Sequence, residues 1–134
     1  MKLINKTKKQ VISTKVIVRE KIHEIVLGLI PYKNKNEYIY DYLKFKKFDK
    51  NDAMLFKVRG KSGIHTWFMS FPIAIFFLDK DWKVIEKVEL RPFESYKPNQ
   101  KCESFIELDD FWFGKISIGN ELKITTTPVK NINL

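Results

Sequence analysis

The sequence IAIFFLDKDWKVIEKVEL, residues 73–90, decides the fold class. Its first part, Ile73–Leu78, is apolar without alternation, which is typical of a strand that is buried on both faces. The charged segment Asp79–Asp81 predicts a hairpin turn. The segment Trp82–Leu90 then returns as an antiparallel strand. We expect three of its side chains to face water: Lys83, Lys87 and Glu89. The hairpin therefore predicts a β-sheet core.

Short runs rich in β-branched and aromatic residues predict further strands on either side of this hairpin. They are residues 11–18, 38–46, 53–58, 64–69, 104–108 and 122–126. Residues 20–31 have a helical period instead, because four apolar residues share one face: Ile22, Ile25, Val26 and Leu29. Pro31 ends that helix. The chain is therefore predicted to be a mainly-β, single-domain antiparallel sandwich or barrel with one N-terminal helix.

The length of 134 residues suffices for one domain with a packed core. We expect a basic arm at residues 1–10, a β domain at 11–127 and a tail at 128–134. Cys102 is the only cysteine, so no internal disulfide forms. The first residues lead into no apolar signal-peptide segment, and the longest uncharged stretch, residues 62–78, is interrupted by Pro72. These features predict a cytoplasmic protein without a membrane association.

The positive charge is concentrated in the first half of the chain. Residues 1–61 carry 16 Lys and Arg against 6 Asp and Glu, whereas residues 62–134 carry 9 against 10. An asymmetry of this size is compatible with an anionic partner, either RNA or an acidic protein. It is equally compatible with a lysine-rich surface that only keeps the protein soluble. Both interpretations stay open.

Several segments follow one another in the order seen in a known family: Ala53-Met54-Leu55-Phe56, His65-Thr66-Trp67-Phe68-Met69-Ser70-Phe71-Pro72-Ile73, Phe77-Leu78-Asp79-Lys80-Asp81, Tyr96-Lys97-Pro98 and Phe105-Ile106-Glu107-Leu108. Over roughly residues 16–124 the chain resembles the uncharacterised family catalogued as domain of unknown function 192. The resemblance implies a compact, jelly-roll-like β fold and no particular activity. The chain departs from the family at three places, since Trp82 replaces a turn glycine, Ala74 replaces an aspartate and Asp109-Asp110 replaces a Pro-Ala pair.

One candidate ligand site lies on the predicted strand at residues 64–69. The period of two places His65, Trp67 and Met69 on the same face, where an imidazole, an indole and a thioether could line a pocket. The alternative is a half-buried histidine on an ordinary core strand.

A second candidate is a phosphate-binding or RNA-binding surface. Residues 38–50 interleave aromatic side chains with lysines, a pattern compatible with stacked bases and paired phosphates. The basic residues of this candidate are Lys44, Lys46, Lys47, Lys50, Arg59 and Lys61. The alternative is a strand whose aromatics face the core while its lysines face water.

The sequence indicates no catalytic residue, metal site or cofactor. Two histidines and one cysteine give no metal-ligand spacing, and no serine lies in a nucleophile motif. The first prediction is therefore a non-enzymatic binding or accessory module of unidentified partner. The second is a nucleic-acid or ribosome-associated protein that uses its basic first half, and the third is an enzyme acting on a small substrate.

Overall fold

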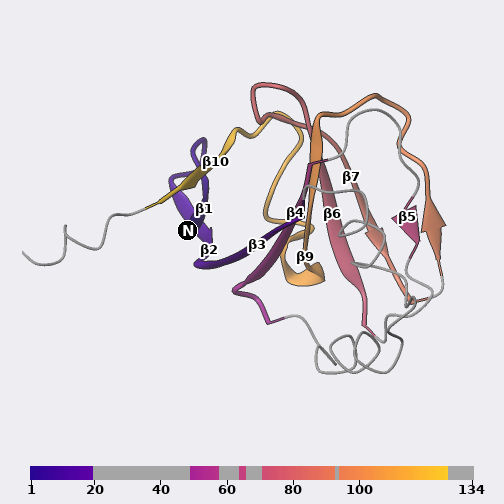
Figure 1. Ribbon diagram of the computed structural model, residues 1–134. Helices are drawn as coiled ribbons and strands as arrows, with labels where there is room; N and C mark the ends of the chain where they lie inside the picture. Colours follow the sequence, from indigo (N-terminus) through magenta and orange to yellow (C-terminus); the bar gives the residue numbers. More distant parts are fainter. Residues whose placement is uncertain (20–48, 58–63, 66–70, 93, 127–134) are drawn as a thin grey trace, which may run out of the picture.

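A computed structural model describes residues 1–19, 49–57, 64–65, 71–92 and 94–126, and Figure 1 shows the course of the chain. The described part contains ten strands and one short 3-10 helix. They are β1 (Lys2–Asn5), β2 (Gln10–Ser13), β3 (Lys15–Arg19), β4 (Asp52–Phe56), β5 (Ile64–His65), β6 (Ile73–Leu78), β7 (Val84–Leu90), β8 (Ser95–Tyr96), β9 (Ser104–Asp109), η1 (Asp110–Trp112) and β10 (Leu122–Thr125). The mainly-β prediction is confirmed.

The centre of the molecule is a five-stranded sheet in the order β3-β4-β9-β6-β7. All six residues of β6 are buried, as the unbroken apolar run predicted. Alternate side chains serve two different cores. Ala74, Phe76 and Leu78 pack into one, while Ile73, Ile75 and Phe77 pack into the other. This two-sided burial explains why no polar residue interrupts the strand.

A second, three-stranded sheet in the order β10-β1-β2 covers one face of the central sheet. Leu3, Ile12 and Leu122 from the small sheet join the core that contains Phe76 and Ile106. These two sheets form a sandwich, with the small sheet at one side of the view in Figure 1. The buried Asn5 amide donates to Oδ1 of Asn120 at 2.9 Å, which fixes the entry to β10 against the end of β1.

The opposite face of the central sheet carries a second core. It contains Met54, Phe56, Ile73, Ile75, Phe77, Leu90, Cys102 and Phe105. Phe56 and Phe105 stack with their ring centroids 4.8 Å apart. Tyr96 of β8 packs against this core, and β8 pairs with β5 in a separate two-stranded sheet.

The β6–β7 hairpin turn has an unusual residue at its end. Oδ1 of Asp79 accepts hydrogen bonds from the backbone N–H groups of Asp81 and Lys83, both at 2.9 Å. Trp82 then adopts a φ of 62°, in the left-handed region that favours glycine. The family that the chain resembles has a turn glycine at this position, and the left-handed backbone accounts for that glycine.

Three details of the predicted fold are wrong. The sheet is not wholly antiparallel, because β3 pairs in parallel with β4. None of the described sheets closes into a barrel. The predicted strand 11–18 is broken at Thr14, so that β2 and β3 enter different sheets.

Some predicted segments lie outside the described residues, and one lies within them. The predicted helix at residues 20–31, the strand at 38–46 and the tail at 128–134 lie outside the described residues. Residues 1–10, predicted as a basic arm, contain β1, whose Leu3 is fully buried.

Candidate functional site

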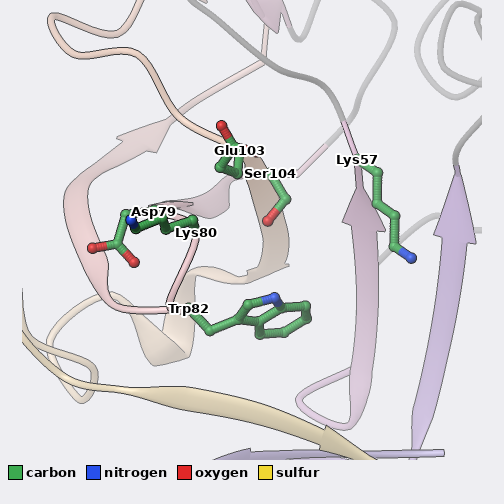
Figure 2. Close-up of a pocket in the computed structure, with 6 residues that line it drawn as sticks. All are labelled: Lys57, Asp79, Lys80, Trp82, Glu103 and Ser104. Atoms are coloured by element: carbon green, nitrogen blue, oxygen red, sulfur yellow. The ribbon is translucent and has the colours of Figure 1, made fainter.

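A pocket of about 270 Å³ lies at one end of the sandwich. It is lined by Lys57, Asp79, Lys80, Trp82, Glu103 and Ser104, and Figure 2 shows these side chains. Three segments that are distant in sequence meet here: the end of β4, the β6–β7 turn and the beginning of β9. We refer to this feature as the end pocket.

Strand register brings these segments together. Ser104 is paired with Leu78 of β6, and the next residue, Phe105, is paired with Phe56 of β4. Lys57 and Asp79, the residues that follow β4 and β6, therefore emerge at the same end of the sheet. The Glu103 N–H donates to the Leu78 carbonyl at 2.9 Å and holds the β9 entry against the turn.

Ser104 is the most informative residue of the end pocket. It is only 4 % exposed, and its Oγ has no hydrogen-bond partner among the residues that the structure describes. A buried hydroxyl left unpaired costs about 1–3 kcal/mol. In Figure 2 this hydroxyl points toward the indole of Trp82. Ser104 therefore places a buried, unused hydrogen-bonding group in the wall of the pocket.

Trp82 forms the apolar wall of the end pocket. Its side chain is partly buried and packs against the core between the two sheets. Its carbonyl accepts a hydrogen bond from Leu122 N–H at 2.9 Å, so the strained residue is tied to β10. A left-handed backbone at a bulky residue costs on the order of 1–2 kcal/mol, and such residues occur in turns and are enriched at functional sites. A glycine would avoid this strain but could not supply the indole.

The charged groups around the end pocket are not equivalent. The Asp79 carboxylate is engaged by the two N–H groups of its own turn and therefore serves the hairpin. In Figure 2 the Glu103 side chain extends away from Trp82 and Ser104. Lys57 and Lys80 also line the pocket, and Lys80 is exposed; in Figure 2 the ammonium groups of both lysines point away from Trp82 and Ser104. The Trp82 indole offers a flat apolar face, and the four charged residues that line the pocket are two of each sign.

Two buried glutamates lie outside the end pocket. Glu107 is at the middle of β9, the central strand, where it is paired with Met54 and Ile75. It is 2 % exposed and its Oε2 has no hydrogen-bond partner. Burial raises the pKa of its carboxyl to about 8. The carboxyl group is therefore largely protonated at neutral pH.

Glu86 of β7 anchors the loop that contains β8. Its carboxylate accepts hydrogen bonds from the Tyr96 hydroxyl and from the backbone N–H groups of Asn99 and Gln100, the latter two at 3.0 and 3.2 Å. The hydrogen bond to Glu86, followed by burial, raises the pKa of Tyr96 to about 12. Glu86 is thus a structural residue.

The residues predicted for binding are not brought together within the described part. His65 belongs to β5, where its backbone is paired with Ser95, and Trp67 and Met69 lie outside the described residues. Of the six predicted phosphate-binding residues, Lys50 is described and exposed. The other five lie outside the described part: Lys44, Lys46, Lys47, Arg59 and Lys61.

Sequence reasoning missed Ser104, because a serine at the start of a strand has no distinctive pattern. Trp82 did give a signal, since it stands in place of a turn glycine. In the described ranges no three His, Cys, Asp or Glu side chains are grouped as metal ligands. Cys102 is buried there, and burial raises the pKa of its thiol. None of the helices that the structure describes is long and apolar enough to cross a membrane.

Comparison with known proteins identifies the family. The family DUF192, described as "Uncharacterized ACR", matches residues 33–125, which is more than half of the chain. The chain belongs to the DUF192 family. The predicted resemblance is therefore confirmed, although the segment before residue 33 lies outside the match. Search of the curated proteins gives no match to this DUF192 chain.

Two solved structures share the fold of this DUF192 protein. A putative transcription regulator from Sinorhizobium meliloti 1021 is similar with a TM-score of 0.68 at 14% identity, covering 91% of this chain and 89% of that one. A protein of unknown function from Novosphingobium aromaticivorans DSM 12444 has a TM-score of 0.67 at 12% identity, with coverages of 92% and 82%. At these identities the likeness extends to the fold alone.

Proposed function

We propose that this DUF192 protein is a non-enzymatic module that binds a small ring-bearing anion in the end pocket. The ring lies on the indole of Trp82, the anionic group accepts a hydrogen bond from Ser104, and Lys80 neutralises its charge. The Ser104 hydroxyl carries this proposal: it is buried in the pocket wall without a hydrogen-bond partner among the described residues, and a ligand that moves the lining side chains aside would complete its hydrogen bonding.

The size of the end pocket supports a small ligand. Its volume of about 270 Å³ lies just below the range of about 300–1,000 Å³ that drug-sized molecules occupy. The lining combines one aromatic wall with a few polar groups, which is the usual composition of a binding site. Trp82 supports the same conclusion. Its left-handed backbone costs free energy that a glycine would avoid, and an indole that binds a ligand would explain why tryptophan stands here.

The absence of a base next to Ser104 supports binding without catalysis. A serine nucleophile needs a base within hydrogen-bond reach. Within the described residues, Ser104 Oγ has no hydrogen-bond partner of any kind. The Asp79 carboxylate, which also lines the pocket, is occupied by the hairpin turn.

The test is a binding titration with benzoate, followed by saturation-transfer NMR and by tryptophan fluorescence. We expect weak binding, with Kd at about the millimolar level for so small a ligand. Benzyl alcohol has the ring without the charge, and acetate has the charge without the ring. Both should bind more weakly than benzoate if the indole and Lys80 act together.

Matched variants decide whether the end pocket is the site. Ser104→Ala should weaken benzoate binding about five- to tenfold, as expected for one hydrogen bond. Lys80→Gln should weaken it by a similar factor, while Lys101→Gln, an exposed lysine outside the pocket, should not. Equal affinity in the wild type and in Ser104→Ala would refute the proposal.

The face predicted at His65, Trp67 and Met69 remains a separate prediction of the same class. The backbone of His65 in β5 is paired with Ser95 of β8, and His65 is not among the residues that line the end pocket. A His65→Ala variant that loses benzoate binding while Ser104→Ala retains it would favour that face over the end pocket.

A further inference from the structure

Phe111 lies on the surface between two lysine ammonium groups. The side chain is 37 % exposed although it is large and apolar. Nζ of Lys50 is 4.2 Å from the ring centroid, and Nζ of Lys115 is 4.7 Å from it. An exposed ring with two cations in contact is uncommon among surface side chains that merely face solvent.

Two hydrogen bonds fix the backbones that carry Phe111 and Lys50. Oδ2 of Asp109 accepts the N–H of Phe111 at 2.9 Å and caps η1. The indole N–H of the buried Trp112 donates to the Lys50 carbonyl at 2.8 Å. The Phe111 and Trp112 rings are perpendicular, with centroids 5.2 Å apart. The backbones that carry Lys50 and Phe111 are therefore fixed relative to each other.

A third cation belongs to the same surface. Nζ of Lys8 donates to the Lys115 carbonyl at 2.6 Å. Lys6 pairs with Glu121 nearby, and the described ranges show no ion pair of Lys8, Lys50 or Lys115 with a carboxylate. Asp110, the carboxylate next to Phe111, interacts with Glu89. Burial and then Asp110 raise the pKa of Glu89.

We infer that Lys8, Lys50, Phe111 and Lys115 form a docking surface for single-stranded nucleic acid. A base stacks on Phe111, and the lysines contact the flanking phosphates. An exposed cation–π contact is weaker than base stacking, so a base can displace one ammonium from the ring toward a phosphate. The aromatic ring favours nucleic acid over an acidic peptide, which would use the lysines but not Phe111. Two of the three lysines belong to the basic first half of the chain.

The test is fluorescence anisotropy with a labelled oligouridylate of about twelve nucleotides, a length within the usual site size for such surfaces. Wild-type affinity should fall linearly with the logarithm of the salt concentration. Phe111→Ala should lower the affinity at least fivefold. The double variant Lys50→Gln/Lys115→Gln should also lower it and reduce the salt slope by about 1.4, as expected for two lost phosphate contacts on a single strand.

The matched control is Lys97→Gln/Lys101→Gln, which removes the same charge from exposed lysines elsewhere. It should bind like the wild type. Equal losses in both double variants would mean that net charge alone is responsible, and the inference would fail. It would also fail if Phe111→Ala, checked for folding by its thermal midpoint, bound normally, or if polyglutamate competed as well as unlabelled oligouridylate. The double lysine variant changes only exposed side chains, so it tests the surface even if Phe111→Ala does not fold. None of these results depends on the end pocket.

Discussion

Trp82 has a strained backbone and an indole that packs against the core. Two substitutions distinguish the effects of these two features on stability. Both Trp82→Gly and Trp82→Ala remove the indole from the core between the sheets. Glycine also relieves the left-handed strain at φ 62°, whereas alanine keeps it. We expect Trp82→Gly to be more stable than Trp82→Ala by about 1 kcal/mol in urea unfolding. Equal stabilities would mean that the turn rearranges in the variants.

Substitution of Ser104 should affect stability and ligand binding in opposite directions. Ser104→Ala removes a buried hydroxyl that has no hydrogen-bond partner, so the free energy of unfolding should stay level or rise by about 1 kcal/mol. Residues at functional sites often lower the stability of the folded protein in this way. Thermal unfolding without ligand measures the effect. A loss of more than about 1 kcal/mol would show that the hydroxyl is used structurally.

Glu107 should make the stability depend on pH. Its pKa is about 8 in the folded protein and near 4.5 when unfolded. The folded state therefore holds the proton more tightly, and this stabilisation is full below pH 4.5 and lost as the pH rises through 8. The contribution should fall by roughly 3 kcal/mol between pH 5 and 8.

The measurement compares urea unfolding of the wild type and Glu107→Gln across that pH range. The difference between the two proteins should change with pH, because glutamine does not titrate. Glu121→Gln, a surface substitution, serves as the control. A constant difference between wild type and Glu107→Gln would contradict the raised pKa of this buried carboxyl.

At the scale of elements, Glu86 joins β7 to the loop that contains β8. Glu86→Ala would leave the N–H groups of Asn99 and Gln100 without their acceptor. We expect a loss of about 2–4 kcal/mol in the free energy of unfolding and faster hydrogen exchange at these two amides. Glu89→Ala, on the same strand but exposed, should change stability by less than about 0.5 kcal/mol.

Elements whose burial follows from local pattern could be predicted from the sequence. The run Ile73–Leu78 is apolar throughout because it faces two cores, and it was predicted as such. The parallel pairing of β3 with β4 could not be predicted, since it depends on a contact across more than thirty residues. Glu86 and Glu107 were missed because a glutamate in a strand is usually taken to face water. Glu107 did offer a signal, since it interrupts the otherwise apolar run Phe105–Leu108.

At the scale of the whole molecule, the sandwich buries most of the large apolar side chains that the structure describes, so we look for function at its ends and on its surface. The sequence prediction placed function on one strand face and on a basic segment that lie mostly outside the described residues. The end pocket instead depends on three segments that only the fold brings together. Spatial neighbours of this kind have no fixed spacing in sequence, which is why the pocket could not be predicted.

The central claim is that the end pocket is a ligand site, and NMR of the ¹⁵N-labelled protein tests it most directly. During a benzoate titration we expect the largest shifts at the Trp82 indole N–H, which Trp82→Gly assigns, and at the backbone amides of Lys80 and Ser104. Saturable shifts confined to these groups are the predicted result. Shifts that are absent, or that centre on other parts of the chain while the Trp82 indole signal stays fixed, would contradict the account.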